Sequence, residues 1–392
     1  MELKPKGLNG EVILVIISVF LYFTSLGGIG SIISRFSREL GADTFETGLI
    51  FSLGPFIGMF TRIPSGLMAD KYGSKYFMIF GGVMVTISAL YASTISEYTG
   101  VYIVRVLQGI SMGLFISASI AAISIYGYIK YLTHLLSYRA AVISLSGLIG
   151  PLLTTYIVDH VGYREAFYTM ALFGAVSALS SYMLPHKKSG VERGSGGRIL
   201  EVVSNRIVIT LLILPLVNGG IFFALNSLLQ DHVYTLGQPS LVIGRMLFVV
   251  GLIGMVSRLY AVKLIDRIGS INTLTTGIIV EALGVSILTL YDGAEIMLHL
   301  AASLFGGGIG LTVPSGQYIL LSNVSEDTRN TATAIYASGF DVGGTLGVIG
   351  LSYVASIYGF EASYTVMALI LASSGSFLWI SLRRVCRSYS GG

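Results

Sequence analysis

Apolar residues fill long, nearly unbroken stretches of this chain, and short polar segments separate them. A helix that crosses the hydrocarbon of a bilayer needs about 20 mostly apolar residues. Twelve stretches reach this length, so the pattern predicts an all-α membrane protein with twelve transmembrane helices. The expected spans are residues 11–34, 47–69, 76–95, 100–126, 139–158, 166–184, 207–229, 241–264, 272–291, 295–321, 331–356 and 363–382.

Composition supports a membrane location. The chain is 53% hydrophobic and 11% charged, with a mean hydropathy of +0.79, whereas soluble domains carry about 25% charged residues. The 49 glycines fit the close helix packing of membrane bundles. The first apolar stretch, from Val12 to about Ile33, is longer than a cleaved signal core and is expected to be the first span. Membrane lipids are therefore expected partners.

The distribution of Lys and Arg predicts the orientation. With the N-terminus in the cytoplasm, the inner segments hold seventeen Lys and Arg residues and the outer segments hold three, Arg35, Arg38 and Arg164. Cytoplasmic loops carry such an excess. We expect a multi-pass protein of the plasma membrane with both termini in the cytoplasm.

One polar segment divides the chain near its midpoint. "PHKKSGVERGSGGR", residues 185–198, is basic and rich in Gly and Ser, which is typical of a flexible linker. The expected organisation is an N-terminal six-helix bundle (1–184), a cytoplasmic linker (185–205) and a C-terminal six-helix bundle (206–392).

The two halves repeat each other. "GMFTRIPSGLMADKYGS" (58–74) and "GMVSRLYAVKLIDRIGS" (254–270) share six of 17 positions at an offset of 196, and residues 162–172 resemble 359–369 at an offset of 197. Internal repeats of this kind indicate a duplicated architecture. Two bundles of equal topology can rock about a shared central site and open it to one side at a time.

Three motifs resemble those of the major facilitator superfamily. "GLMADKYGSK" (66–75) is similar to the family signature between the second and third helices, and "RVLQGISMG" (105–113) resembles the fourth-helix motif of proton-coupled members. "SGLIGP" (146–151) looks like a shortened form of the fifth-helix motif of exporters. The resemblance implies two pseudo-symmetric six-helix bundles that work by alternating access.

The first motif and its copy are candidate gating elements. Gly73 permits the positive φ of a tight turn, and Gly66 leaves room for a neighbouring helix. The carboxylate of Asp70 can bind the N-terminus of another helix, which the resemblance identifies as the eleventh helix near Arg329; the alternative is a loop turn with topogenic charge. The gating set is Arg62, Gly66, Asp70, Lys71 and Gly73, with Arg258, Asp266, Arg267 and Gly269 in the second half.

A polar face on the fourth span is a candidate cavity wall. Arg105, Gln108, Met112 and Phe115 follow the spacing of one helix face, and the resemblance places this helix at the substrate cavity. The alternative for Arg105 is a structural ion pair. Further candidates, which are alternatively interhelical hydrogen-bonding residues, are Tyr22, Thr24, Ser25, Asn218, Asn226, Gln230 and Tyr336.

Two carboxylates inside predicted spans are candidate proton carriers. Ionisable residues are costly in the bilayer and are functional candidates. Asp341 ranks first, because its repeat counterpart at an offset of 197 is Ser144. Glu281 ranks second, because the resemblance places the ninth helix away from the cavity. In a low dielectric, either side chain favours its neutral, protonated form. The alternative is neutralisation by a fixed Arg.

Several chemistries have no support in the sequence. There is no nucleotide-binding P-loop, no H-E-x-x-H motif and a single cysteine, and the five histidines are scattered. We expect no cofactor, no metal, no nucleic-acid partner and no enzymatic activity. The expected function is proton-coupled export of a small organic solute by a monomer. The alternatives are proton-coupled or facilitated uptake of a sugar, organic acid or similar metabolite, and a non-transporting receptor on the same scaffold.

Overall fold

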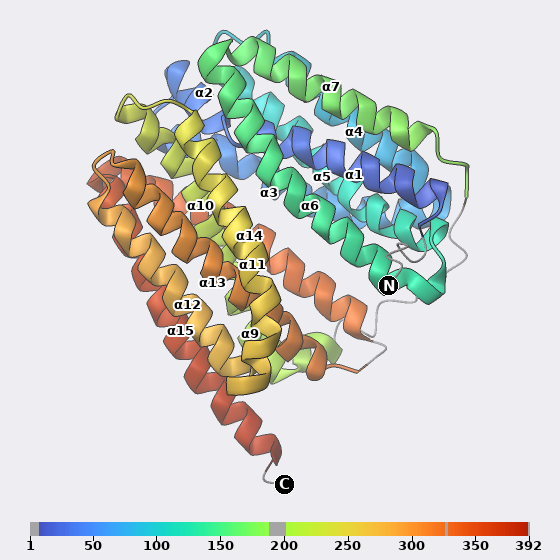
Figure 1. Ribbon diagram of the computed structural model, residues 1–392, viewed down its shortest axis with the longest axis vertical. Coiled ribbons are helices and arrows are strands. Elements are labelled where there is room, and N and C mark those ends of the chain that lie inside the picture. The colour runs from blue at the N-terminus through green and yellow to red at the C-terminus, as the bar shows by residue number, and fades with distance from the viewer. Residues whose placement is uncertain (1–7, 188–200, 326–327, 391–392) are drawn as a thin grey trace, which may run out of the picture. The chain divides into compact units, whose positions relative to one another are not determined.

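The computed structural model describes residues 8–187, 201–325 and 328–390, and all regular secondary structure in them is helical (Figure 1). The predicted spans 11–34 and 207–229 are each divided between a long and a short helix, and each of the other spans is occupied mainly by one long helix, which confirms the all-α class. In the first half these are α1 (Gly10–Gly30), the short α2 (Ile33–Glu39), α3 (Thr44–Tyr72), α4 (Ser74–Ala92), α5 (Thr99–Tyr126), η1 (Ile129–Tyr131), α6 (Leu132–His160) and α7 (Tyr163–Tyr182). In the second half they are α9 (Arg206–Leu211), α10 (Ile213–Thr235), α11 (Leu241–Ile268), α12 (Ser270–Ile287), η2 (Leu288–Leu290), α13 (Glu295–Ser322), α14 (Arg329–Tyr358) and α15 (Phe360–Ser390).

Helix ends differ from the expected spans where polar turns extend an apolar core. α6 begins at Leu132 rather than at 139, and α10 continues to Thr235 rather than ending at 229. By length and composition, ten helices of the described chain qualify as membrane spans. The two other long helices are less apolar, because α3 contains two prolines and Arg62, and α7 begins with Arg164 and Glu165.

The helices form two compact units. Among the described residues, unit 1 takes 8–42, 53–187 and 239–244, and unit 2 takes 43–52, 201–238 and 245–390. Most of the predicted linker, residues 188–200, lies outside the described residues. The units follow the two halves of the sequence, except that the first turns of α3 and α11 are exchanged.

The exchanged turns pack through equivalent residues of the repeat. In unit 2, a Cβ at Gly48 of α3 would collide with the hydroxyl of Ser352 on α14. In unit 1, a Cβ at Gly244 of α11 would collide with Thr155 Oγ1 on α6. Gly244 lies 196 residues after Gly48, and Ser352 lies 197 residues after Thr155. At each of these first turns, a glycine allows the neighbouring helix to approach closely.

The repeated motif adopts the same turn twice. Gly73 ends α3 with a φ of +97°, and Gly269 ends α11 with a φ of +84°; the next helix begins one residue later in both cases. Residues other than glycine rarely adopt a left-handed backbone. The turn predicted at Gly73 is confirmed, and so is its copy.

Glycines also repeat at the central helix crossing of each unit. Gly109 and Gly113 of α5 face α3, where a Cβ at Gly109 would lie 2.8 Å from the carbonyl oxygen of Gly54. In unit 2, Gly306 and Gly310 of α13 face α11, where a Cβ at Gly310 would lie 2.6 Å from the carbonyl oxygen of Gly254. Such small-residue pairs let membrane helices approach closely. The duplication therefore extends from the loops into the packing.

Candidate functional site

Arg105 is buried in unit 1 at the contact between α5 and α3. Its side chain is 5% exposed, and its Nη1 donates to Gln108 Oε1 at 2.8 Å. A Cβ at Gly54 of α3 would lie 2.6 Å from Arg105 Nη2, so the glycine makes the space that the guanidinium fills. The structure thus brings together the first two residues of the predicted polar face.

The aromatic residues predicted for the cavity form a stack inside unit 1. The rings of Tyr22 (α1) and Phe115 (α5) are parallel with centroids 3.7 Å apart, and both side chains are fully buried. Tyr22 Oη lies 2.9 Å from Ser111 Oγ, which donates to the carbonyl oxygen of Gly81 on α4 at 2.7 Å. The stack therefore joins three helices.

Two other predicted residues of unit 1 lie outside this stack. Met112 is half-buried, and its Cβ would lie 3.6 Å from a Cβ at Gly58 of α3. Thr24 donates to the carbonyl oxygen of Phe20 on its own helix at 2.8 Å. Its α-carbon faces Gly150 of α6, so the structure places Thr24 at a helix-packing contact.

A hydrogen-bonded chain in unit 2 ends in a buried carboxylate. Asn218 Nδ2 of α10 donates to Thr312 Oγ1 of α13 at 3.2 Å, and this hydroxyl donates to Glu281 Oε1 of α12 at 2.7 Å. Glu281 is fully buried, and its Oε2 has no hydrogen-bond partner in the described chain. A Cβ at Gly308 would collide with the Glu281 side chain. We call Asn218, Thr312 and Glu281 the carboxylate relay.

Two of the three residues of the carboxylate relay occupy the positions of the aromatic stack in the repeat. Asn218 lies 196 residues after Tyr22, and Thr312 lies 197 residues after Phe115. Glu281 lies 196 residues after Val85, which is also fully buried. One scaffold therefore holds an apolar stack in unit 1 and a titratable group in unit 2. Thr312 was not among the residues predicted from the sequence; its repeat offset from Phe115 is the signal that identifies it.

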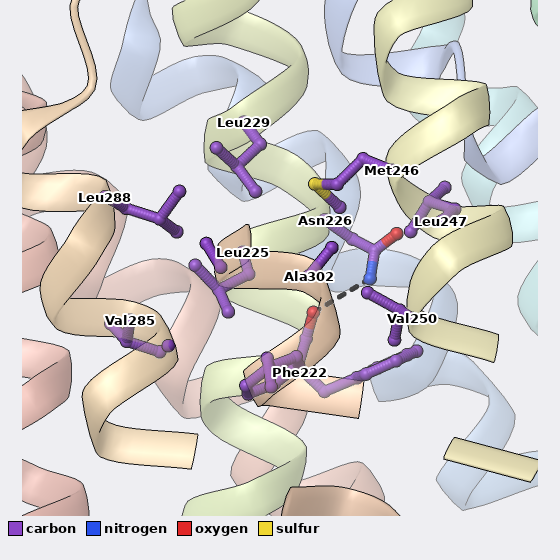
Figure 2. Close-up of a pocket in the computed structure, with 13 residues that line it drawn as sticks. Phe222, Leu225, Asn226, Leu229, Met246, Leu247, Val250, Val285, Leu288 and Ala302 are labelled. Carbon is purple, nitrogen blue, oxygen red and sulfur yellow. Dashed lines mark hydrogen bonds between the residues drawn. The ribbon is translucent and has the colours of Figure 1, made fainter. Parts of the chain in front are cut away.

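An apolar pocket lies on the same helices as the carboxylate relay (Figure 2). It is small, about 20 Å³, and lies between α10, α11, α12 and α13. Asn226 is its one amide, and its Nδ2 donates to the carbonyl oxygen of Phe222 at 2.9 Å. Phe222 lies about one turn beyond Asn218, and Gly284 and Val285 lie about one turn beyond Glu281. The pocket and the carboxylate are therefore neighbours along two helices.

In the repeat, the pocket of unit 2 corresponds to the site of Arg105 in unit 1. Ala302, which lines it, lies 197 residues after Arg105, and Val250 lies 196 residues after Gly54. Where unit 1 buries a guanidinium, unit 2 leaves an apolar space.

Asp341 and Tyr336 lie on α14 of unit 2, near its crossing with α10. Asp341 is 5% exposed, and its backbone carbonyl accepts from Thr345 Oγ1 at 3.0 Å. The two helices touch where Gly343 faces the backbone of Leu216. The hydroxyl of Tyr336 would lie 2.5 Å from a Cβ at Gly316 of α13. Both predicted residues are buried in the unit that holds the relay.

The structure describes the surroundings of Arg62 and Gly66 in the first gating motif, but not the side chain of Asp70. Arg62 is half-buried, and its carbonyl oxygen accepts from Ser117 Oγ of α5 at 3.2 Å. A Cβ at Gly66 would meet Ser117 of α5 at an ordinary 3.8 Å, and the closer contacts between α3 and α5 lie at Gly109 and Gly113. The side chain of Asp70 lies outside the described residues, and its predicted contact with the eleventh helix stays a prediction.

The remaining charges of the two motifs are exposed. Lys71 lies over the ring of Tyr72 at 5.3 Å. The others, in unit 2, are Arg258, Asp266 and Arg267.

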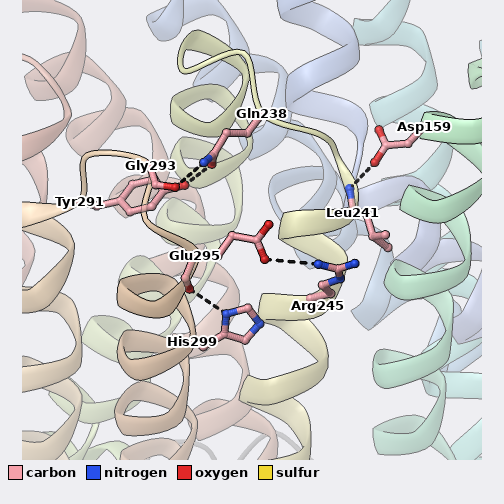
Figure 3. A network of polar contacts seen from close by, with 8 residues as sticks. All are labelled: Asp159, Gln238, Leu241, Arg245, Tyr291, Gly293, Glu295 and His299. Atoms are coloured by element: carbon pink, nitrogen blue, oxygen red, sulfur yellow. Dashed lines mark hydrogen bonds and ion pairs between the residues drawn. The ribbon is translucent and has the colours of Figure 1, made fainter.

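Polar contacts tie the helix ends opposite these motifs (Figure 3). In unit 1 the Asp159 carboxylate accepts from the backbone N–H groups of Ser240 at 2.8 Å and Leu241 at 2.6 Å, and so caps α11. In unit 2, Arg245 pairs with Glu295 at 3.3 Å. Gln238 accepts from the hydroxyl of Tyr291 and donates to the carbonyl oxygen of Gly293.

The fold and the repeated motifs agree with the comparisons. The sequence profile of the Major Facilitator Superfamily matches residues 15–324 and 234–390. The chain belongs to the major facilitator superfamily. Proteins of this superfamily are multi-pass membrane transporters and not enzymes, so the all-α fold of two six-helix bundles expected from the sequence is confirmed.

Similar proteins span nearly the whole superfamily fold of this chain. An uncharacterised MFS-type transporter of Methanocaldococcus jannaschii is 23% identical over 96% of this chain and 99% of its own length. Multidrug resistance protein MdtG of Salmonella dublin is 25% identical over 86% of this chain and 85% of its own. The crystal structure of the nucleoside transporter NupG superposes with a TM-score of 0.74 at 16% identity, over 96% of this chain and 99% of that one.

Proposed function

We propose that this transporter exports a small amphipathic solute in exchange for protons, with Glu281 as the group that gains and loses the proton. The observation that carries the proposal is the carboxylate relay. An ionisable side chain inside a span is costly and is therefore a functional candidate, and Glu281 is fully buried with one oxygen hydrogen-bonded. When it ionises, the Thr312 hydroxyl is placed to stabilise the carboxylate by a charge-assisted hydrogen bond.

The lining of the apolar pocket favours an amphipathic solute, which would have to widen this small pocket to enter it. Its walls are aliphatic and aromatic, and Asn226 is the one amide among the lining residues, which is the usual chemistry of a small-molecule site. Because α10 and α12 carry both the pocket and the carboxylate relay, a solute in the pocket and a proton on Glu281 can influence each other through these helices. The similarity to MdtG, named a multidrug resistance protein, agrees with this solute class.

The other parts of the proposal rest on the predictions made from the sequence. Asp341 is the second proton-coupling candidate, and Arg105 and Gln108 provide a cationic and an amide contact in unit 1. The Asp70 motif acts as a latch that forms in one state of the transport cycle. We place the transporter in the plasma membrane as a monomer, with both termini and the linker at 185–205 in the cytoplasm, because of the excess of Lys and Arg in the inner segments.

Proteoliposomes containing the purified full-length chain provide the test. With ethidium as an amphipathic cationic probe and a pH gradient across the membrane, we expect dye to move against the proton flow. Glu281→Gln should reduce gradient-driven transport to the level of protein-free vesicles and leave dye–dye exchange intact. Glu295→Gln, which neutralises an exposed carboxylate, is the matched control and should retain both activities.

The alternatives give different results in the same vesicles. Solute that moves with the protons would establish uptake instead, a function that the buried guanidinium of Arg105 favours for anionic metabolites. A Glu281→Gln variant that still couples to the gradient, while Asp341→Asn does not, would transfer the proton-carrying role to Asp341. Absence of flux with any solute class would favour a receptor.

A further inference from the structure

A long groove runs between α12 and α15 of unit 2, which lie side by side (Figure 1). Its volume is about 910 Å³, and its lining extends from Thr275 to Ser286 on α12, with Thr289 on η2, and from Thr365 to Ile380 on α15. At 1.5 Å per residue the groove is about 21 Å long, which is more than one leaflet of a hydrocarbon core about 30 Å thick. Exposed apolar side chains such as Ile279, Leu283 and Leu369 line it.

The groove offers almost no hydrogen bonds to an occupant. Five hydroxyl side chains line it, and each donates to a carbonyl oxygen of its own helix at 2.7–2.9 Å: Thr275, Ser286, Thr289, Thr365 and Ser376. A hydroxyl that returns its proton to its own backbone adds little polarity to the surface. The lining is therefore suited to a hydrocarbon chain.

A cation stands at one end of the groove. The guanidinium carbon of Arg383 lies 4.2 Å above the centre of the Trp379 ring, and its Nη2 donates to Asn272 Oδ1 at 2.8 Å. These two contacts fix the plane of the guanidinium and leave its other N–H groups available. In the described part of the chain, no carboxylate forms an ion pair with Arg383.

We propose that this groove binds an anionic phospholipid, with one acyl chain along α12 and α15 and the phosphate at Arg383. A guanidinium matches the geometry of phosphate oxygens, and a tryptophan beside it is typical of the level of the lipid head groups. The Lys and Arg distribution places this end at the cytoplasmic leaflet, where anionic lipids are concentrated. The lipid is a bound ligand of unit 2, and the site is separate from the carboxylate relay.

Charge argues against a second copy of the chain in the groove. Copies that share one orientation in the membrane would bring their Arg383 and exposed Arg384 residues to the same face of the bilayer. Like charges brought together are unfavourable, whereas an anionic lipid neutralises them.

The single tryptophan of the chain makes the site directly measurable. Trp379 lies in the groove, so bromine atoms on a bound acyl chain should quench its fluorescence. We would titrate the full-length protein in vesicles with brominated phosphatidylglycerol or brominated phosphatidylcholine. One basic residue near an anionic surface contributes about 1 kcal/mol, so we expect half-maximal quenching at an about fivefold lower fraction of the anionic lipid.

Two substitutions separate the site from general attraction between charges. Arg383→Gln should abolish the difference between the two lipids. Lys263→Gln, which removes one exposed charge near the same end of unit 2, should retain it. Ala372→Phe fills the groove, where Ala372 is exposed, and should weaken quenching by both lipids, provided that circular dichroism shows a folded protein.

The proposal fails on three results. Equal quenching by the two lipids in the unmodified chain would remove the anionic preference. A preference that survives Arg383→Gln would remove the role of Arg383. Weak quenching by both lipids, together with a dimer detected by light scattering in detergent, would assign the groove to a second copy.

Discussion

Gly54 of α3 supplies the space that the guanidinium of Arg105 fills on α5. The Cβ of any other residue at this position would lie 2.6 Å from Arg105 Nη2 and 2.8 Å from Arg105 Cζ. The two residues therefore act as a pair, in which the small residue on one helix sets where the charge on the next helix lies.

Substitution of Gly54 should move Arg105 without unfolding unit 1. We expect Gly54→Val, which introduces the residue found at the repeat position 250, to break the hydrogen bond from Arg105 to Gln108. Arg105 is a proposed contact of the solute, and a hydrogen bond from a charged group to a ligand contributes about 1.5–3 kcal/mol. A displaced guanidinium should therefore lower solute affinity about tenfold. Equilibrium binding in detergent measures this. Gly58→Ala, whose nearest contacts are 3.5 and 3.6 Å away, is the control and should bind normally.

Substitution of Gly308 should destabilise unit 2 through Glu281. A Cβ at this position collides with the Glu281 side chain and lies 2.6 Å from the carbonyl oxygen of Gly277. Overpacking of this kind costs about 1–3 kcal/mol, and Gly308→Ala should lower the thermal unfolding midpoint accordingly. The adjacent Gly307→Ala meets its nearest atoms at 3.7 Å and should unfold near the unmodified temperature. Equal midpoints for the two variants would contradict the tight α12–α13 contact.

Thr312 should be required for the proton coupling proposed for Glu281. Thr312→Val removes the hydroxyl that donates to Glu281 Oε1. Loss of a charge-assisted hydrogen bond of about 1.5 kcal/mol corresponds to about a tenfold change in a rate. Gradient-driven transport should therefore fall about tenfold. Thr312→Ser keeps the hydroxyl and should keep the rate; an equal loss in both variants would exclude the hydrogen bond as its cause.

The turn at Gly269 should tolerate no other residue without cost, although it has ample space. A Cβ added at Gly269 or at Gly350 would meet no neighbouring atom within 4 Å, but only Gly269 has a positive φ. Gly269→Ala should therefore lose about 1–2 kcal/mol from backbone strain. Gly350→Ala, inside α14, should gain up to about 1 kcal/mol from helix propensity. Chemical denaturation of both variants, followed by circular dichroism, distinguishes backbone strain from crowding.

The hydrophobic pattern was sufficient for the helices and the duplication. Spans in a bilayer have a fixed minimum length, so twelve apolar stretches could be counted directly, and the Gly-Ser motif marked the turns at Gly73 and Gly269 in both halves. The pattern could not place the exchange of the first turns of α3 and α11. That exchange depends on the contacts of Gly48 and Gly244 with residues far along the chain.

The candidate site was recovered in part, because polar residues inside a span are rare and visible. Arg105, Gln108, Asn218 and Glu281 all lie buried. Their contact partners Thr312 and Gly54 could not be predicted from the sequence, because Thr and Gly are common in membrane helices. In the sequence, Asp341 ranked above Glu281 because its repeat counterpart is Ser144. The repeat counterpart of Glu281, at an offset of 196, is the buried Val85, and the change between these two positions is as sharp as that between Ser144 and Asp341.

The exchanged first turns impose an order on biosynthesis. Gly48 can complete its packing only after Ser352 has been synthesised. In the same way, the α6 surface around Thr155 can complete its packing only after Gly244 has been synthesised. A ribosome that has released only the N-terminal half has made a bundle with an unfilled surface on α6. Neither half is therefore a finished folding unit, and each half expressed alone should need the other, supplied in trans, to reach a stable fold.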